Sequence, residues 1–427
     1  MSPHGHAKST GRGSKPGGRD KAHDKKPPES AKNAKGSGSS QGSSTIPIET
    51  QQLLLNVFKT AFSTQSNDEL PAVIQNVKQQ LFNRDFEKAF GSEAHLEAYA
   101  MRWSPSRALA YLEILCSLPQ LSNQFQDTVD GDALQSGEAE HPAGIIEQVA
   151  PDTQVGKRAT KPQPYTVTPN SRSGRSKITC LGGGAGAELV ALAGYMRHLR
   201  SSATTSTQSS QEGLDSGSGT LVNFNIAAVD IADWSTVVQT LSAGICSPPP
   251  ISKYASAALR AVNVPLADPE SFIVTFYRQD VLNMDVQHMA SILQDSTLVT
   301  LMFTLNELYT TSMGGTTNFL LSLTYILEPG SFLLVVDSPG SYSTVDIGKN
   351  PNKEDSSSAA KKYPMQWLLD HTLLEASTIG SSTNTTLGGQ WEKLVSDDSR
   401  WFRLPEGLRY PIELEDMRYQ LHLYRRL

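Results

Sequence analysis

The residues best suited to chemistry lie in one glycine-rich segment, Ile-Thr-Cys-Leu-Gly-Gly-Gly-Ala-Gly-Ala-Glu, at residues 178–188. Its apolar start predicts a strand, and apolar residues at helical spacing follow it from Glu188 to Leu199. Glycines between a strand and a helix permit unusual backbone angles and let a ligand approach the main chain closely. We therefore predict that this turn binds a cofactor. The residues expected to lie against the cofactor are Leu181, Gly182, Gly184 and Gly186.

Two acidic residues follow the next two predicted strands. Asp230 closes the second strand, 44 residues after Gly186, or 24 once the 20 residues of the Ser/Thr-rich run 201–220 are subtracted. A carboxylate about 20 residues after a glycine turn is typical of a ribose-binding site. Asp280 follows the third strand, where many adenosylmethionine-dependent enzymes hold the adenine amino group. Both acids are therefore predicted to bind the cofactor.

The turn excludes one kind of cofactor site and leaves two open. A phosphate-binding P-loop needs Lys followed by Ser or Thr at the helix start, and this turn has neither Lys nor Ser. Gly182, Gly184 and Ala187 match the fingerprint G-x-G-x-x-A, so an NAD(P)-dependent oxidoreductase is an alternative. The sequence has no Tyr-x-x-x-Lys pair for hydride transfer. The order of glycine turn, Asp230 and Asp280 favours methyl transfer from S-adenosylmethionine.

Asn306 and Glu307 are the candidate catalytic residues. They follow the fourth predicted strand, and doubly wound sheets place their substrates at the carboxyl ends of such strands. A carboxylate such as Glu307 can accept a proton from a group within hydrogen-bond reach. Helix capping is the alternative role for both residues. The three cysteines lack a convincing catalytic context and are predicted to be structural: Cys116, Cys180 and Cys246.

Strands and helices alternate from Lys177 onward, which predicts a parallel α/β sheet. The last strand alternates apolar and polar residues after a loop-rich region. We therefore expect it to be antiparallel, at or near one side of the sheet. The predicted strands are 178–181, 223–229, 271–277, 298–304, 331–336 and 417–425.

Composition divides the chain into parts. The first 45 residues lack aromatic, Val, Ile and Leu side chains, so they cannot bury enough surface to order themselves. Helical spacing follows, with Ser104 predicted to cap a helix whose first residue is Pro105. The predicted parts are a disordered basic tail (1–45), an N-terminal helical region (46–121), a flexible linker (122–176) and a main domain (177–427) with mobile polar inserts near 201–220 and 348–362.

Charge is distributed unevenly along the chain. The net charge is −6, but residues 1–40 carry nine Lys/Arg and three acids, or +6, so the remaining 387 residues sum to −12. Residues 157–177 add six basic residues without an acid. Such segments suit salt-sensitive contact with nucleic acid, although a solubilising tail is the alternative.

Other features exclude several classes of protein. The longest apolar runs, such as 319–327, are about half of the roughly twenty residues that a membrane-spanning helix needs. The N-terminus has no apolar core of a secretory signal. Three widely spaced cysteines predict neither a disulfide framework nor a metal site, and favour a reducing intracellular compartment.

Four segments resemble the fungal large-subunit (25S) ribosomal RNA uridine-N3 methyltransferases. They are Tyr-Ala-Met-Arg-Trp-Ser-Pro-Ser-Arg-Ala-Leu-Ala-Tyr (99–111), Cys-Leu-Gly-Gly-Gly-Ala-Gly-Ala-Glu-Leu (180–189), Thr-Leu-Asn-Glu-Leu-Tyr (304–309) and the tail 363–427. The glycine turn belongs to methyltransferases broadly, whereas the first and third segments are more specific. One departure is Cys180, which lies where an acid is often found, two residues before the first glycine.

The resemblance implies a Rossmann-like class I methyltransferase fold, S-adenosyl-L-methionine as methyl donor and a ribosomal RNA uridine as acceptor. It also implies a partner, either large-subunit ribosomal RNA or a pre-ribosomal particle, and action in the nucleus, at the nucleolus, or in the cytoplasm. A non-catalytic ribosome-assembly factor that retains the fold is a further alternative. Side chains suited to RNA contact, by charge and stacking, are Arg102, Trp103 and Arg107; local packing and ion pairing are their alternative roles.

Overall fold

The computed structural model describes residues 46–62, 69–133, 175–208, 222–261, 263–340, 344–347, 361–376 and 390–427. Within it, Ser44–Leu427 form one compact unit. The predicted basic tail 1–45 and most of the predicted linker lie outside the described residues, so those parts stay predictions.

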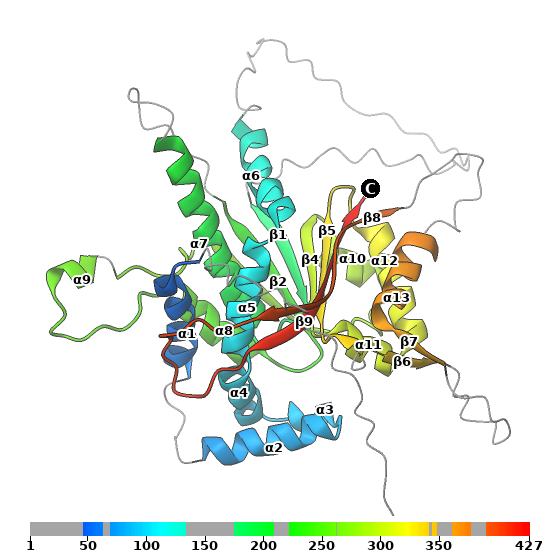
Figure 1. Ribbon diagram of the computed structural model, residues 1–427, viewed down its shortest axis with the longest axis horizontal. Coiled ribbons are helices and arrows are strands. Elements are labelled where there is room, and N and C mark those ends of the chain that lie inside the picture. The colour runs from blue at the N-terminus through cyan, green and yellow to red at the C-terminus, as the bar shows by residue number, and fades with distance from the viewer. Residues whose placement is uncertain are drawn as a thin grey trace, which may run out of the picture. The chain divides into compact units, whose positions relative to one another are not determined.

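A seven-stranded sheet forms the centre of this unit, in the order β3-β2-β1-β4-β5-β9-β8 (Figure 1). The first five strands are parallel, and β9 is antiparallel to both β5 and β8. The predicted α/β sheet with an antiparallel last strand near one side is therefore confirmed. The strands are β1 (Ser176–Leu181), β2 (Phe224–Asp230), β3 (Phe272–Arg278), β4 (Ser296–Met302), β5 (Phe332–Asp337), β8 (Trp391–Phe402) and β9 (Met417–Arg426). A separate two-stranded sheet pairs β6 (Thr344–Ile347) with β7 (Lys361–Pro364).

Strand β8 was not predicted, and its sequence explains why. Its residues, WEKLVSDDSRWF, mix charged and apolar side chains without regular alternation. Its register with β9 shifts twice, between Lys393 and Val395 and between Asp397 and Arg400. Bulges and charges are usual on an edge strand, because they discourage pairing with other chains. By contrast, every residue of β5 is buried, as expected for a central strand covered on both faces.

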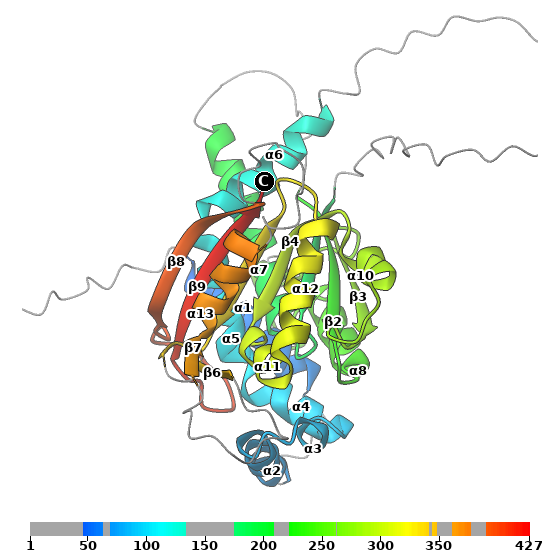
Figure 2. The same cartoon turned by 90° about the vertical axis from the view of Figure 1, so that its right-hand side faces the viewer.

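Helices cover both faces of the sheet (Figure 2). One apolar core joins β-strand residues to α1, α4, α5, α6, α7 and α8, and a second joins the opposite face to α10, α11, α12 and α13. The helices are α1 (Ile48–Ala61), α2 (Leu70–Phe82), α3 (Phe86–Ala89), α4 (Glu93–Arg102), α5 (Ser104–Cys116), α6 (Pro119–Ala133), α7 (Ala187–Gln208), α8 (Ser235–Ile245), α9 (Ala257–Ala261), α10 (Val286–Leu293), α11 (Leu305–Thr311), α12 (Met313–Ile326), α13 (Met365–Asp370) and the π-helix η2 (His371–Glu375).

The N-terminal helices pack directly onto the sheet-covering helix α7. A methyl group on Gly194 of α7 would come within 3.0 Å of Leu54 and 3.1 Å of Leu112, so the small residue lets α1 and α5 approach closely. Leu54 and Leu112 are fully buried in the shared core. The predicted helical region therefore belongs to the same compact unit as the sheet.

Two segments expected to be mobile are partly helical. Helix α6 continues to Ala133, into the predicted linker, because Phe125 packs against Tyr195 at 6.0 Å and Phe224 at 5.1 Å between ring centroids. Helix α7 continues to Gln208, into the Ser/Thr-rich run 201–220. There the hydroxyls of two serines donate to carbonyls one turn earlier, which serine does within helices. The insert predicted near 348–362 also ends earlier, because β7 starts at Lys361.

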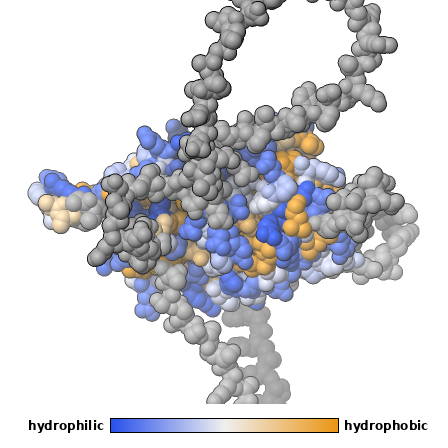
Figure 3. All heavy atoms as spheres, turned by 90° about the horizontal axis from the view of Figure 1, so that it is seen from above, coloured by the Kyte–Doolittle hydropathy of each residue, from blue (hydrophilic) through white to orange (hydrophobic). Residues whose placement is uncertain are grey.

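The surface of the unit is mixed in polarity. On the face seen in Figure 3, hydrophilic side chains are interspersed with smaller hydrophobic areas. Among the described residues, none of the helices is both long and apolar enough to cross a bilayer.

Candidate active site

A cavity of about 920 Å³ opens at the carboxyl ends of the parallel strands. It lies beside the point where the strand order reverses, between β1 and β4, which is where open α/β sheets bind their ligands. In Figure 1 this end of the sheet points toward α2, α3, α4 and α11. Nine residues predicted from the sequence line the cavity: Gly182, Gly186, Asp230, Asp280, Asn306, Glu307, Arg102, Trp103 and Arg107.

The glycine turn follows β1 as predicted, and its residues lack room for side chains. Gly182 has a φ of +81°, a left-handed conformation that favours glycine. A Cβ atom on Gly184 would lie 2.2 Å from Cδ1 of Trp234 and 2.9 Å from Oδ2 of Asp230. Leu181 does not line the cavity: its side chain is in the core and its carbonyl accepts a hydrogen bond from the Thr304 hydroxyl at 3.1 Å.

Asp230 ends β2 and fixes the turn through its carboxylate. Oδ2 accepts the backbone N–H of Gly184 at 3.2 Å, and Oδ1 accepts that of Ala232 at 3.2 Å. Burial raises the pKa of Asp230 to about 6, while these backbone hydrogen bonds oppose the rise. A carboxylate has about four acceptor positions, so Asp230 can also accept hydrogen bonds from ligand hydroxyls.

Asp280 follows β3 and lies at the edge of the same cavity. Its Oδ1 accepts the backbone N–H of Leu282 at 2.9 Å, and its Oδ2 accepts the Asn283 amide at 2.6 Å. The neighbouring Gln279 donates its backbone N–H to the carbonyl of Asp230 at 2.8 Å. The ends of β2 and β3 therefore present the two acids on one side of the cavity.

Glu188 is a site residue that the sequence reasoning treated only as the start of a helix. It is 4% exposed, lines the cavity, and its Oε1 accepts a hydrogen bond from Thr300 at 2.5 Å. Burial raises its pKa to about 8. Glu188 Oε2 and Cys180 Cβ both lie 2.7 Å from where a Cβ on Gly183 would be. The Glu188 carboxylate, from the first turn of α7, therefore lies close to the Cys180 side chain of β1.

The first residue of α5 supports the glycine turn. Ser104 was predicted to cap α5, which was wrong: its buried hydroxyl donates instead to the carbonyl of Ala185 in the turn, at 2.8 Å. This hydrogen bond joins positions 81 residues apart. The turn is therefore held from β2 by Asp230 and from α5 by Ser104.

The three predicted RNA-contact residues have partners within the protein. Arg102 forms an ion pair with Glu415 and donates to the carbonyl of Glu413 at 3.2 Å. Trp103 packs against Tyr99, with ring centroids 5.0 Å apart. Arg107 donates to the Tyr99 hydroxyl at 2.6 Å, and its guanidinium lies 4.9 Å from the Phe303 ring centroid.

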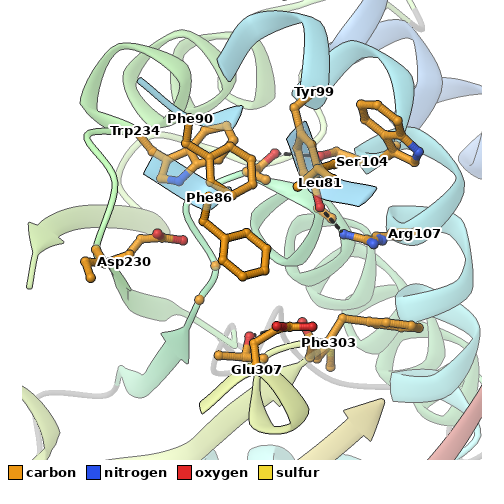
Figure 4. A pocket seen from close by; sticks show the side chains of 18 of the residues that line it. Leu81, Phe86, Phe90, Tyr99, Ser104, Arg107, Asp230, Trp234, Phe303 and Glu307 are labelled. Atoms are coloured by element: carbon orange, nitrogen blue, oxygen red, sulfur yellow. Dashed lines mark hydrogen bonds between the residues drawn. The ribbon is translucent and has the colours of Figure 1, made fainter. Parts of the chain in front are cut away.

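An aromatic wall, defined by Phe86, Phe90, Tyr99 and Trp234, lines the cavity beside the glycine turn (Figure 4). Phe90 lies 5.2 Å from Tyr99 and 5.4 Å from Trp234 between ring centroids. Flat apolar rings of this kind suit the stacking of a nucleobase. In the sequence, the signal for three of these four residues is the density of aromatic residues between positions 82 and 103.

The end of β4 is conformationally unusual. Phe303 has a φ of +59°, which is an outlier for a bulky residue, and donates its backbone N–H to Val336 at 2.7 Å. This turn ends β4 at Met302, before the predicted Thr304. It directs the chain into α11, where Asn306 is buried and Glu307 is partly exposed on the cavity. Strain at such a position is typical of functional sites.

Asp337 is a second residue that sequence reasoning missed, at the end of the apolar strand β5. Its carboxylate accepts the backbone N–H groups of Asn306 at 3.0 Å and Ser338 at 2.7 Å. Burial raises its pKa to about 6. Asp337 thereby anchors the first turn of α11, which carries Asn306 and Glu307.

The three cysteines are unsuited to nucleophilic chemistry. Burial raises the pKa of Cys116 to about 12 and raises the pKa values of Cys180 and Cys246 as well. A thiol acts as a nucleophile in its thiolate form, which burial disfavours here. None of the three lines the cavity.

Comparisons with known proteins identify the family of this chain. A family described as "Putative SAM-dependent methyltransferase" matches residues 58–425. The 25S rRNA (uridine(2843)-N(3))-methyltransferase of Saccharomyces cerevisiae is 32% identical over 390 residues, which cover 89% of this chain and 86% of the yeast protein.

Solved structures that are similar to this chain have lower sequence identity to it than the yeast relative has. An O-methyltransferase family protein from Burkholderia thailandensis is 11% identical, with a TM-score of 0.33 over 85% of this chain and 74% of that one. A methyltransferase from Methanosarcina mazei is 10% identical, with a TM-score of 0.30 over 59% and 93% of the two chains. The family match and the yeast relative do not favour the oxidoreductase alternative. The chain belongs to the S-adenosylmethionine-dependent methyltransferases.

Proposed function

We propose that this protein methylates N3 of a uridine in large-subunit ribosomal RNA. The observation that carries the proposal is the partly exposed Glu307 carboxylate at the end of β4, in the cavity beside the glycine turn. The activity named for the yeast relative, which aligns with 89% of this chain, supports the choice of substrate. The raised pKa values of the three cysteines argue against methylation at pyrimidine carbon 5, which would use a thiolate nucleophile.

The cavity has the features that S-adenosylmethionine requires. Gly182 and Gly186 line the cavity, so the main chain of the turn can be approached there, whereas Gly184 makes room for the Trp234 side chain. Asp230 offers acceptor positions for ribose hydroxyls. We assign the adenine side to Asp280 and the cationic amino group of the methionine end to Glu188. When bound, the cofactor supplies an electrophilic methyl group.

Glu307 accepts the proton of N3 in this proposal. Uridine N3 loses its proton only above neutral pH, so a carboxylate within hydrogen-bond reach helps deprotonation. Asn306 and Asp337 hold the first turn of α11, which fixes the position of Glu307. Much of the remaining acceleration comes from holding the reacting groups in line.

N3 lies on the Watson–Crick edge, so the target base must be unpaired or extruded from its helix. We propose that the aromatic wall and Trp103 stack on RNA or cofactor bases, and that Arg107 contacts the extruded nucleotide. Arg102 can bind RNA only if a phosphate replaces Glu415 as its ion-pair partner.

We further propose a pre-ribosomal particle as the natural substrate and the nucleolus as the site of action, on the basis of the two basic segments 1–40 and 157–177.

Transfer of labelled methyl groups tests the proposal. Wild type and Glu307→Gln are incubated with labelled S-adenosylmethionine and unmodified large-subunit rRNA, and donor affinity is measured by calorimetry. We expect the wild type to label the RNA and Glu307→Gln to lose about 100-fold or more in rate with unchanged donor affinity. Absence of transfer together with absence of donor binding by the wild type would overturn the proposal.

A further inference from the structure

Arg84 has an unusual backbone conformation beside the cavity. It follows α2 with a φ of +58°, in the left-handed region. Two hydrogen bonds define the turn: the N–H of Arg84 donates to the carbonyl of Leu81 at 3.0 Å, and that of Asp85 donates to Gln80 at 2.9 Å. This is the Schellman arrangement that ends a helix, and its left-handed residue is usually glycine. Here the position holds an arginine, whose Cβ disfavours the conformation.

The Arg84 side chain extends to the candidate base. Its Nη2 lies 3.5 Å from Oε1 of Glu307, a residue 223 positions away in the sequence. The two side chains are 50% and 39% exposed, and both line the cavity. An ion pair this exposed adds little stability, so it does not explain why a non-glycine residue lies here. A strained position beside an active site is reason to look for a functional role.

The chemistry of uridine gives the guanidinium a role. Removal of the N3 proton leaves a negative charge that spreads onto the two flanking carbonyl oxygens, O2 and O4. A carboxylate at N3 takes the proton but does nothing to stabilise that charge. A guanidinium adjacent to the carboxylate can donate hydrogen bonds to one of these oxygens, and it binds the anion more strongly than the neutral base.

The other cationic side chains that line the cavity either bind other residues of the protein or form no ion pair with Glu307. Arg102 is paired with Glu415, and Arg107 is bonded to Tyr99. Lys78, on α2, forms no ion pair with Glu307. Among the described cavity residues, Arg84 is therefore the cation in contact with Glu307.

We propose that Arg84 is a catalytic residue that binds a carbonyl oxygen of the target uracil and stabilises the anion formed at N3. This inference rests on the proposed uridine-N3 methyl transfer. The N3 proton passes to Glu307, and the electron pair left on N3 forms the bond to the methyl carbon. The sulfur–methyl bond breaks with its electron pair remaining on sulfur, which leaves S-adenosylhomocysteine. Glu307 then releases its proton to water.

Arg84→Gly is an informative variant because it removes the guanidinium and places the favoured residue in the left-handed position. We expect its melting temperature to be equal to or above that of the wild type. Donor affinity measured by calorimetry should be unchanged, while the single-turnover methylation rate on large-subunit rRNA falls about 10- to 100-fold. The matched control is Lys88→Ala, which removes one positive charge from the same segment; Lys88 pairs with Asp85 and does not line the cavity.

A second substrate separates charge stabilisation from RNA binding. Large-subunit rRNA transcribed with 5-fluorouridine has a more acidic N3, because fluorine withdraws electrons. Its N3 anion therefore needs less stabilisation by a guanidinium. We expect the ratio of wild-type to Arg84→Gly rates to be at least about threefold smaller on this RNA. Equal losses on both RNAs, equal losses in Lys88→Ala, or a wild-type rate for Arg84→Gly on uridine RNA would each overturn the role of Arg84. A wild type that methylates neither RNA would overturn the proposed function, and this inference with it.

Discussion

At the scale of single residues, three acids of the site are buried or partly buried, and none of them forms an ion pair with another described residue. Glu188, Asp230 and Asp337 are satisfied mainly by hydroxyl or backbone N–H donors, and burial raises the pKa of each. Burial penalises the ionised form of each acid, most strongly that of Glu188. In the proposed function, a cationic methyl donor with ribose hydroxyls offsets this penalty, which links the electrostatics of the cavity to the ligand.

Glu188→Gln tests this electrostatic argument. The folded-state pKa of Glu188 is raised to about 8 from 4.5, so the folded protein holds a proton that the unfolded chain releases. The free energy of unfolding of the wild type therefore falls as pH rises from about 5 to 8. In the variant this contribution is absent, because glutamine does not titrate. We expect Glu188→Gln to gain on the order of 1–3 kcal/mol over wild type at pH 8 and to differ little at pH 5, by urea unfolding. The same variant should bind S-adenosylmethionine more weakly. A stability difference that does not change with pH would contradict the assignment.

Asp230→Ala should separate donor binding from catalysis. It removes the acceptor for the Gly184 and Ala232 N–H groups and the predicted ribose contact. We expect donor affinity to fall by at least about tenfold, since a lost hydrogen bond to a charged group corresponds to roughly 1.5–3 kcal/mol. Calorimetry on Asp230→Ala and Glu307→Gln makes the comparison, because only the first should lose donor affinity. Equal losses in both variants would refute the division of roles.

At the scale of secondary-structure elements, the glycine turn is held by two neighbours from distant parts of the chain. Asp230 reaches it from β2, and Ser104 reaches it from α5. The sequence predicted the turn, six of the seven strands of the sheet and the order of the acids after them, because those signals are local. It did not predict the Ser104 contact, because a serine before a proline is also a good helix cap.

The difference between local sequence signals and tertiary contacts also explains why other site residues and one strand were not predicted. Glu188 and Asp337 are single acids within apolar elements, so their roles depend on which side of the element faces the cavity. Arg84 contacts Glu307 only through the tertiary fold. The charged strand β8 gives no periodic signal because it is an edge strand.

Ser104→Ala tests whether α5 supports the turn. Loss of the hydroxyl leaves the carbonyl of Ala185 without this 2.8 Å hydrogen bond, at an expected cost of about 1–3 kcal/mol in the free energy of unfolding. Donor affinity should also fall, because the turn is less well fixed. Ser117→Ala is the control: its hydroxyl donates locally to Ile114 at the other end of α5. If both variants bind donor as the wild type does, α5 has no part in shaping the turn.

At the scale of the whole molecule, charge and catalysis occupy different parts of the chain. Residues 41–427 carry −12, and the acids of the cavity contribute to that sum, whereas residues 1–40 carry +6. An acidic catalytic unit repels RNA at long range. The basic segments at 1–40 and 157–177 can offset that repulsion.

Deletion of residues 1–40 should therefore weaken RNA binding without affecting the donor. We expect rRNA affinity to fall by about tenfold at low salt and the slope of log affinity against log salt to become shallower, because fewer counterions are released. Filter binding over a salt series measures both quantities. An unchanged slope would assign the electrostatic attraction to the rest of the chain.

We propose that the methyl group is transferred to N3 of uridine. The direct measurement is the identity of the modified nucleoside after wild-type protein has reacted with S-adenosylmethionine and unmodified large-subunit rRNA, by digestion and chromatography with mass spectrometry. We expect N3-methyluridine in the wild-type reaction and none in the Glu307→Gln reaction. A product methylated at carbon 5, at the ribose or on another base would contradict it.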